Sequence, residues 1–173
     1  TGTGVRPCVL ASPIMRTSRL PLTFFRPGPP MRILLVKTSS LGDVIHNLPV
    51  ASDLHLRFPD AQIDWCVEES FADIPRLHPA VDQVIPVATR RWRRSLGEVS
   101  TWREMRDFRR RIGAREYTAV LDTQGLLKSA LIARQANGRH WGYAAEAARE
   151  AIAARFYDAT FVIPWNVHAV QRN

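Results

Sequence analysis

From Met31 onward, short apolar runs alternate with longer stretches in which apolar residues recur every three or four positions. The runs are rich in β-branched side chains and bounded by polar residues, which is typical of strands buried on both faces of a sheet. They predict strands at residues 33–36, 63–67, 84–87 and 119–122, with further strands expected at 139–141 and 160–163.

The stretches between the runs have a helical period. They predict helices at residues 44–58, 71–77, 102–112, 126–136 and 146–155. Pro49 lies within the first two turns of the first helix and is expected to kink it. Strands that alternate with helices in this way form βαβ units, so the pattern predicts an α/β fold: a Rossmann-like parallel sheet with helices on both faces.

In such sheets, ligands bind beyond the carboxyl ends of the strands. The loops that should carry function are therefore those at residues 38–43, 68–70, 88–95 and 122–128. All four are rich in polar or charged residues, as a binding edge requires.

Residues 1–30 differ from the rest of the chain. They hold four arginines, no acidic residue and six of the 12 prolines, without any helical or strand period. We expect an unstructured leader that is either non-native, with Met31 as the natural beginning, or an organelle transit peptide. Residues 31–173 should form the folded domain, and the apolar pattern still continues near residue 170, as expected of a chain cut before its end.

The overall composition narrows the class of protein. With 46% hydrophobic and 23% charged residues, the 173-residue chain is globular, and its apolar runs fall short of the roughly 18–20 residues that span a bilayer. Two cysteines make no disulfide framework, and Cys66 lies in an apolar run typical of a buried thiol in a reducing compartment. No pair of histidines has metal-ligand spacing, so no metal is expected.

The first candidate site is the loop that joins the first strand to the first helix. A glycine and the amides of a starting helix favour a bound anion, although neither the P-loop nor the dinucleotide motif is present. The aspartate at its end is either a stabilising first-turn carboxylate or a general base that accepts a hydroxyl proton. The candidate residues are Thr38, Ser39, Ser40, Gly42 and Asp43, with His46 one turn further on.

The second candidate is the run Arg90, Arg91, Trp92, Arg93 and Arg94. Arginine forks match carboxylates and phosphates, so the run could hold an anionic substrate. It could equally contact nucleic-acid phosphates while Trp92 stacks on a base, or form a solvated basic loop. The arginines further along, at residues 103–111, alternate with acidic residues and predict a salt-bridged helix face.

The loop after the fourth predicted strand repeats the design of the first. Asp122 is expected to cap the next helix or to fix a neighbouring loop, while Gln124 and Lys128 could touch substrate. A turn that starts a helix would explain the same residues without any ligand.

These motifs together resemble the bacterial lipopolysaccharide heptosyltransferases of glycosyltransferase family 9. The similarity runs through Met-Arg-Ile-Leu-Leu-Val-Lys-Thr-Ser-Ser-Leu-Gly-Asp at residues 31–43 and continues at residues 65–69, 84–87, 90–93, 122–129 and 168–170. The Arg-Arg-Trp-Arg run is more similar to the first heptosyltransferase than to the second.

The resemblance implies the N-terminal, acceptor-binding domain of a two-domain GT-B enzyme, with the C-terminal donor-binding domain absent. Such an enzyme moves L-glycero-D-manno-heptose from ADP-heptose to a Kdo sugar of the Kdo2–lipid A inner core, with inversion and without a metal. It implies Asp43 as the base and Arg90, Arg91 and Arg93 as the residues that hold the acceptor, with Arg94 as a further candidate. It also implies a cytoplasmic protein in peripheral contact with the anionic inner membrane.

The net charge of +8 keeps a second class of function open: a basic nucleic-acid-binding α/β module. Half of that excess, however, belongs to residues 1–30, and no helix-turn-helix, zinc or RNA-recognition signature is present. The resemblance therefore favours heptosyl transfer and no nucleic-acid partner.

Overall fold

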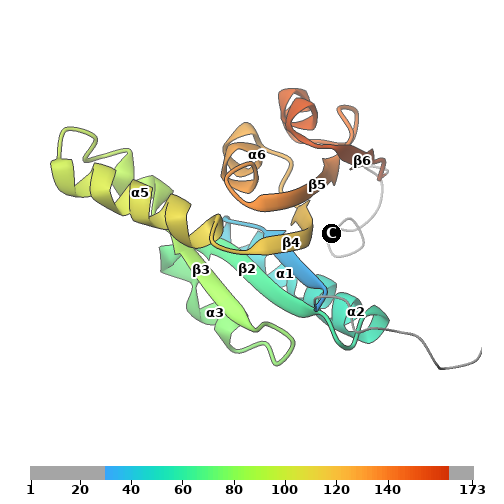
Figure 1. Cartoon of the computed structure of the whole chain (residues 1–173). Helices are drawn as coiled ribbons and strands as arrows, with labels where there is room; N and C mark the ends of the chain where they lie inside the picture. The colour runs from blue at the N-terminus through green and yellow to red at the C-terminus, as the bar shows by residue number, and fades with distance from the viewer. Residues whose placement is uncertain (1–29, 164–173) are drawn as a thin grey trace, which may run out of the picture.

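The computed structural model describes residues 30–163. Its centre is a six-stranded parallel sheet with the strand order β3-β2-β1-β4-β5-β6, which is the order of a doubly wound Rossmann-like fold (Figure 1). The predicted α/β class is confirmed. The strands are β1 (Arg32–Val36), β2 (Gln62–Glu68), β3 (Gln83–Val87), β4 (Glu116–Asp122), β5 (Asn137–Tyr143) and β6 (Ala159–Phe161).

Helical segments follow each of the first five strands and cover both faces of the sheet. They are α1 (Leu41–His46), α2 (Leu48–Arg57), η1 (Glu69–Phe71), α3 (Asp73–Arg76), α4 (Thr89–Trp92), α5 (Val99–Ile112), α6 (Leu127–Ala133) and η2 (Ala151–Phe156). None of these described helices is long and apolar enough to cross a membrane. The predicted leader and the motif at residues 168–170 lie outside the described part of the chain.

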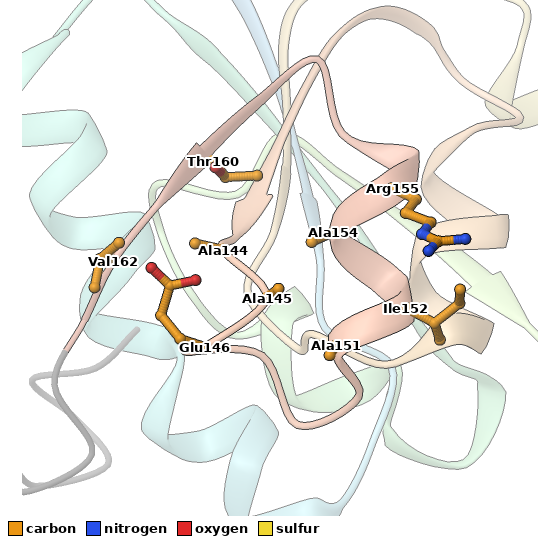
Figure 2. Close-up of a pocket in the computed structure, with 9 residues that line it drawn as sticks. All are labelled: Ala144, Ala145, Glu146, Ala151, Ile152, Ala154, Arg155, Thr160 and Val162. Atoms are coloured by element: carbon orange, nitrogen blue, oxygen red, sulfur yellow. The ribbon is translucent and has the colours of Figure 1, made fainter.

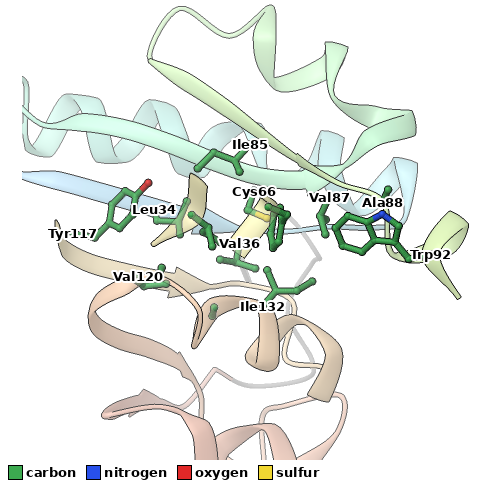
Figure 3. Close-up of a cluster of buried hydrophobic side chains, with 14 residues drawn as sticks. Leu34, Val36, Cys66, Ile85, Val87, Ala88, Trp92, Tyr117, Val120 and Ile132 are labelled. Carbon is green, nitrogen blue, oxygen red and sulfur yellow. The ribbon is translucent and has the colours of Figure 1, made fainter. Parts of the chain in front are cut away.

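Two cores form because successive side chains of a strand point to opposite faces. Leu34 of β1 faces α5 and α6 and belongs to a cluster with Phe108 and Ile132. Figure 3 shows Leu34 and Ile132 within this cluster. Leu35 faces the other way and joins the cluster under α1, α2 and α3. Cys66 lies in the first cluster without any exposed surface, as the sequence predicts.

Two predicted helices are different in the structure. The helix expected at 44–58 is two helices that meet at Asn47, because Pro49 sits in the first turn of α2, where its missing N–H costs no hydrogen bond. The helix expected at 146–155 begins only at Ala151 and is a 3-10 helix. Glu150 is extended there, since its N–H binds the Gly125 carbonyl and its carboxylate accepts the Leu127 N–H at 2.7 Å.

The strand register decides which loops meet. Val36 lies opposite Cys66 on one side and Asp122 on the other, and Asp122 lies opposite Gly142. The carboxyl ends of β1, β2, β4 and β5 therefore reach one edge of the sheet. The loops that follow these strands form the candidate site.

Candidate active site

The loop after β1 is joined to the loop after β4 by buried hydrogen bonds. Gln124 Oε1 accepts from both the backbone N–H and the hydroxyl of Thr38, each at 2.8 Å. The ammonium of Lys37 donates to the Thr123 carbonyl at 2.6 Å. The structure thus brings Thr38 and Gln124 together, but both are buried, and they brace the two loops from the inside. Their contact with substrate stays a prediction.

Ser39 and Lys128 continue this connection toward the surface. The exposed Lys128 donates from Nζ to Ser39 Oγ at 2.9 Å. Ser40 and Gly42 are exposed, and a side chain added at Gly42 would meet no atom within 4 Å. The space beside this loop is therefore open to a ligand.

Asp43 is the third residue of α1 and closes the start of that helix. Its Oδ2 accepts from the backbone N–H of Ser40 at 3.0 Å and from the Ser40 hydroxyl at 3.2 Å, which is a capping box. Arg149 forms a bidentate ion pair with the same carboxylate, with Nη2 2.8 Å from Oδ1 and Nη1 3.3 Å from Oδ2. Asp43 is therefore the stabilising first-turn carboxylate that the sequence left open as one alternative. The same carboxylate also lies at the edge of the sheet where ligands are expected to bind.

The charge of Asp43 follows from these contacts. Partial burial alone would raise its pKa, but the hydrogen bond from Arg149, together with the backbone N–H of Ser40, holds the pKa below its ordinary value. Asp43 is therefore ionised at neutral pH, as a general base must be before it takes a proton. The half-buried His46 lies one turn further along α1.

Arg149 is the site residue that sequence reasoning missed. It follows β5, 106 residues after Asp43 in the chain, and falls within a segment predicted as a plain helix. The available signal was topological: an arginine soon after a strand whose carboxyl end reaches the same edge as the Asp43 loop.

Asp122 fixes its own turn rather than capping α6. Its Oδ1 accepts from the N–H of Gln124 at 2.8 Å and of Gly125 at 3.3 Å, and its Oδ2 accepts from the Tyr157 hydroxyl at 2.8 Å. Burial raises the pKa of this carboxyl group. Gly125 has φ of 68°, and a Cβ there would come within 2.9 Å of the Tyr143 ring, so the turn requires glycine.

The segment expected as an arginine-rich loop begins with a short helix, α4. Buried Glu68, at the end of β2, explains why. Its carboxylate accepts from the Thr89 hydroxyl at 2.5 Å and from the Arg90 N–H at 3.0 Å. A buried carboxylate at a helix start satisfies free N–H groups and complements the helix dipole.

Two members of the run are held by the protein itself. Arg91 lies between Glu69, at 3.0 Å, and Glu104, at 2.8 Å, and these hydrogen bonds raise its pKa further. Trp92 is 7% exposed, packs edge-on against Phe108 and donates its indole N–H to Glu104 at 2.9 Å. Stacking of Trp92 on a nucleic-acid base, one of the sequence-based alternatives, is therefore wrong for this structure.

The other three arginines of the run are exposed and form no ion pair with the described residues. The guanidinium of Arg90 lies over the Phe71 ring, 5.3 Å from its centroid. Arg93 and Arg94 are exposed, and no acidic side chain among residues 30–163 pairs with them. Of the four predicted anion-binding arginines, these are the ones free to meet an external anion.

The arginines of α5 are less paired than the sequence predicts. Within the described residues, Asp107 is the acidic partner on the helix, at 3.8 Å from Arg106 and 3.9 Å from Arg110. Glu104 is occupied by Arg91 instead. The predicted salt-bridged face is confirmed only around Asp107.

Comparison with known proteins shows what this chain is similar to. Residues 105–173 match glycosyltransferase family 9 (heptosyltransferase). Lipopolysaccharide heptosyltransferase 1 of Pseudomonas aeruginosa is 50% identical over 143 residues, which are 82% of this chain and 40% of that protein. The Salmonella typhimurium protein of the same name is 49% identical over 143 residues, 82% of this chain and 45% of its own length.

A solved structure agrees. Escherichia coli heptosyltransferase WaaC with ADP-2-deoxy-2-fluoro heptose has a TM-score of 0.80 at 46% identity, over 82% of this chain and 45% of that one. The chain is a homologue of the family 9 glycosyltransferases. The resemblance predicted from the sequence is confirmed, as is the fold class expected for a GT-B glycosyltransferase domain. The chain spans less than half the length of these heptosyltransferase relatives.

Beside the candidate site, this family 9 homologue has a hollow of about 630 Å³ past the carboxyl end of β5. Figure 2 shows its lining, with Glu146 on one wall and Arg155 on another, and small alanine side chains between them. None of the predicted site residues lines it. Across residues 30–163, no three histidine, cysteine, aspartate or glutamate side chains gather in a way that could hold a metal ion.

Proposed function

We propose that this chain provides the acceptor-binding side of an inverting heptosyltransferase. The reaction moves L-glycero-D-manno-heptose from ADP-heptose to a Kdo sugar of the Kdo2–lipid A inner core of lipopolysaccharide. The identity of about half of the residues to heptosyltransferase 1 proteins over 82% of the chain carries the proposal. In this scheme a further domain holds most of the donor nucleotide, and ADP-heptose is a substrate rather than a resident cofactor.

Asp43 acts as the general base. It takes the proton of the acceptor hydroxyl while the hydroxyl oxygen forms a bond to the anomeric carbon of heptose. The bond from that carbon to the ADP oxygen breaks, and ADP leaves with the electron pair. Its ionised state and its place at the open edge of the sheet support this role. Since Arg149 engages both carboxylate oxygens, the acceptor hydroxyl must share or displace one of these contacts.

Arg90, Arg93 and Arg94 hold the anionic acceptor, whose Kdo carboxylates suit arginine forks. Lys128 adds a cation beside the loop of Ser39, Ser40 and Gly42, with Arg91 and Gln124 acting from behind as braces. The absence of acidic partners for Arg93 and Arg94 among residues 30–163 supports this assignment.

The acceptor is a membrane lipid, so we place the protein in the cytoplasm, in peripheral contact with the cytoplasmic face of the inner membrane. The basic charge of the chain supports contact with anionic lipid.

Calorimetric titration of the whole chain with a delipidated Kdo-containing inner-core glycan tests the proposal. Saturable binding is expected, and Arg93→Ala or Arg94→Ala should weaken it by roughly 10- to 150-fold, since a hydrogen bond to a charged group contributes about 1.5–3 kcal/mol. Arg57→Ala, which removes an exposed arginine of α2, is the matched control and should bind normally.

A single-stranded oligonucleotide titrated at the same salt concentration addresses the alternative class. If the oligonucleotide binds and the glycan does not, the heptosyltransferase proposal is wrong and the nucleic-acid module replaces it. Equal glycan affinity in the Arg93 and Arg94 variants would remove these residues from the acceptor site.

A further inference from the structure

One surface of the molecule has no place in the chemistry above. α5 reaches out past the sheet, with its first turns and the preceding loop at the far end (Figure 1). We call this surface the α5 tip and define it by Leu96, Val99, Trp102, Arg103 and Arg106. It lies immediately after Arg94 in the chain but includes none of the proposed acceptor residues.

The α5 tip is apolar where a soluble surface is normally polar. Leu96 is 49% exposed, Val99 67% and Trp102 57%. The indole N–H of Trp102 donates to the Leu96 carbonyl at 2.8 Å. Because this donor is already satisfied, the ring can leave water for an apolar environment without an unpaired N–H.

Cations lie directly behind these apolar groups. Positions 99, 103, 106 and 110 repeat every three or four residues, so they share one exposed face of α5. Arg103 has no acidic partner in the described part of the chain, and Arg106 has only Asp107 at 3.8 Å. Glu98 is the acidic residue at the tip itself, where it accepts a hydrogen bond from the Ser100 hydroxyl at 3.1 Å.

We propose that the α5 tip docks on an anionic lipid bilayer. Leu96, Val99 and Trp102 enter the headgroup boundary, while Arg103 and Arg106 bind lipid phosphates. A bilayer has an apolar layer beneath its anionic headgroups. When the apolar residues of the tip reach the apolar layer, the arginines behind them lie at the depth of the headgroups. Tryptophan with an apolar face at the membrane–water boundary is energetically favoured.

Docking here would bring Arg93 and Arg94 close to the membrane that holds a lipid-anchored acceptor. The purpose of docking thus rests on the proposed function, but binding to lipid does not. Vesicle binding and glycan binding are separate measurements on different residues, so either proposal can fail while the other stands.

The test is co-sedimentation of the whole chain with vesicles of phosphatidylcholine alone or with added phosphatidylglycerol. Binding should require the anionic lipid and fall as salt rises. Arg103→Ala and Arg106→Ala should each lower the partition coefficient about fivefold, the effect of one basic residue near an anionic surface. Val99→Gln should also lower it, which an electrostatic attraction alone would not cause.

Matched controls lie on other faces. Arg57→Ala removes the same charge from α2, and Leu77→Gln changes an 85% exposed apolar residue beyond α3. Both should keep the parent's partition coefficient, and glycan affinity should be unchanged in the α5 tip variants.

Three outcomes would overturn the inference. One is the absence of binding to anionic vesicles; another is an equal loss of binding in the control variants. The third is normal vesicle binding by the α5 tip variants. The attraction would then come from basic residues elsewhere, such as the arginines of residues 1–30. If the tip variants lose affinity for an oligonucleotide and not for vesicles, the surface binds nucleic acid instead.

Discussion

The loop after β1 and the α5 tip differ in whether their charged side chains have partners within the protein. In the loop, Lys37, Thr38 and Asp43 each have partners contributed by the loops after β4 or β5. At the tip, Arg103 has no acidic partner among the described residues, and apolar side chains face solvent. A polar group with protein partners is preorganised before any ligand arrives, as a catalytic group must be. Exposed groups without such partners remain available to bind another molecule.

The largest effect should come from the most constrained residue. Asp43→Ala should lower heptosyl transfer by about 10²–10⁴-fold, the usual contribution of a general base, while acceptor affinity stays within a few-fold. The measurement requires a chimaera in which this chain replaces the matching segment of the Pseudomonas aeruginosa relative. Asp53→Ala, at an exposed acidic residue of α2, is the control and should keep full turnover. Retained turnover in the Asp43 variant would exclude it as the base.

A smaller effect, on the free energy of unfolding, should distinguish buried Glu68 from exposed Glu69, the two carboxylates that contact α4. Glu68→Ala leaves the Thr89 hydroxyl and the Arg90 N–H without their buried acceptor, so the free energy of unfolding should fall by about 1–3 kcal/mol. Urea denaturation measures it. Glu69→Ala removes an exposed ion pair with Arg91 and should change stability much less. Equal losses in the two variants would contradict the assignment of Glu68 as the anchor of α4.

The smallest effect concerns the ion pair that crosses the site. In Arg149→Ala the pKa of Asp43 should rise, because burial then acts without the opposing guanidinium. NMR titration of the carboxyl group measures this shift, and Arg155→Ala is the control from the same segment.

The sign of the pH dependence follows. With its pKa held below 3.8, Asp43 contributes stability that is present above that pH and is lost as the pH falls through the folded-state pKa. The Arg149 variant should lose most of this contribution, because the Ser40 N–H is still present, so its stability should change less with pH in that window. An unchanged Asp43 pKa would show that Arg149 does not control the carboxylate in solution.

The strands and their common edge were predictable because each is a short apolar run bounded by polar residues, and parallel connection then fixes where the loops meet. The loops containing Asp43 and Asp122 were predicted for the same reason. Both alternatives for Asp43 concern one side chain, and sequence spacing cannot separate a capping carboxylate from a base that also caps.

What the sequence could not predict depends on contacts between distant segments. Nothing local indicates that Glu68 accepts the Thr89 hydroxyl and the Arg90 N–H at the start of α4, or that Trp92 turns inward to Phe108. The pair of Arg149 with Asp43 spans 106 residues, and Arg91 takes the carboxylate of Glu104 that the helical pattern assigns to arginines of α5.

The burial of Cys66 has a practical consequence. Its thiol lies in the middle of the sheet, and desolvation raises its pKa far above the usual range. The thiolate is the nucleophile that attacks an alkylating reagent. While the sheet is closed, the reagent cannot reach Cys66 and the thiol is not ionised, so no alkylation occurs. The rate at which Cys66 is alkylated therefore measures how often β2 separates from its neighbours. The native Cys66 thiol can therefore report the opening of the sheet, without any added label.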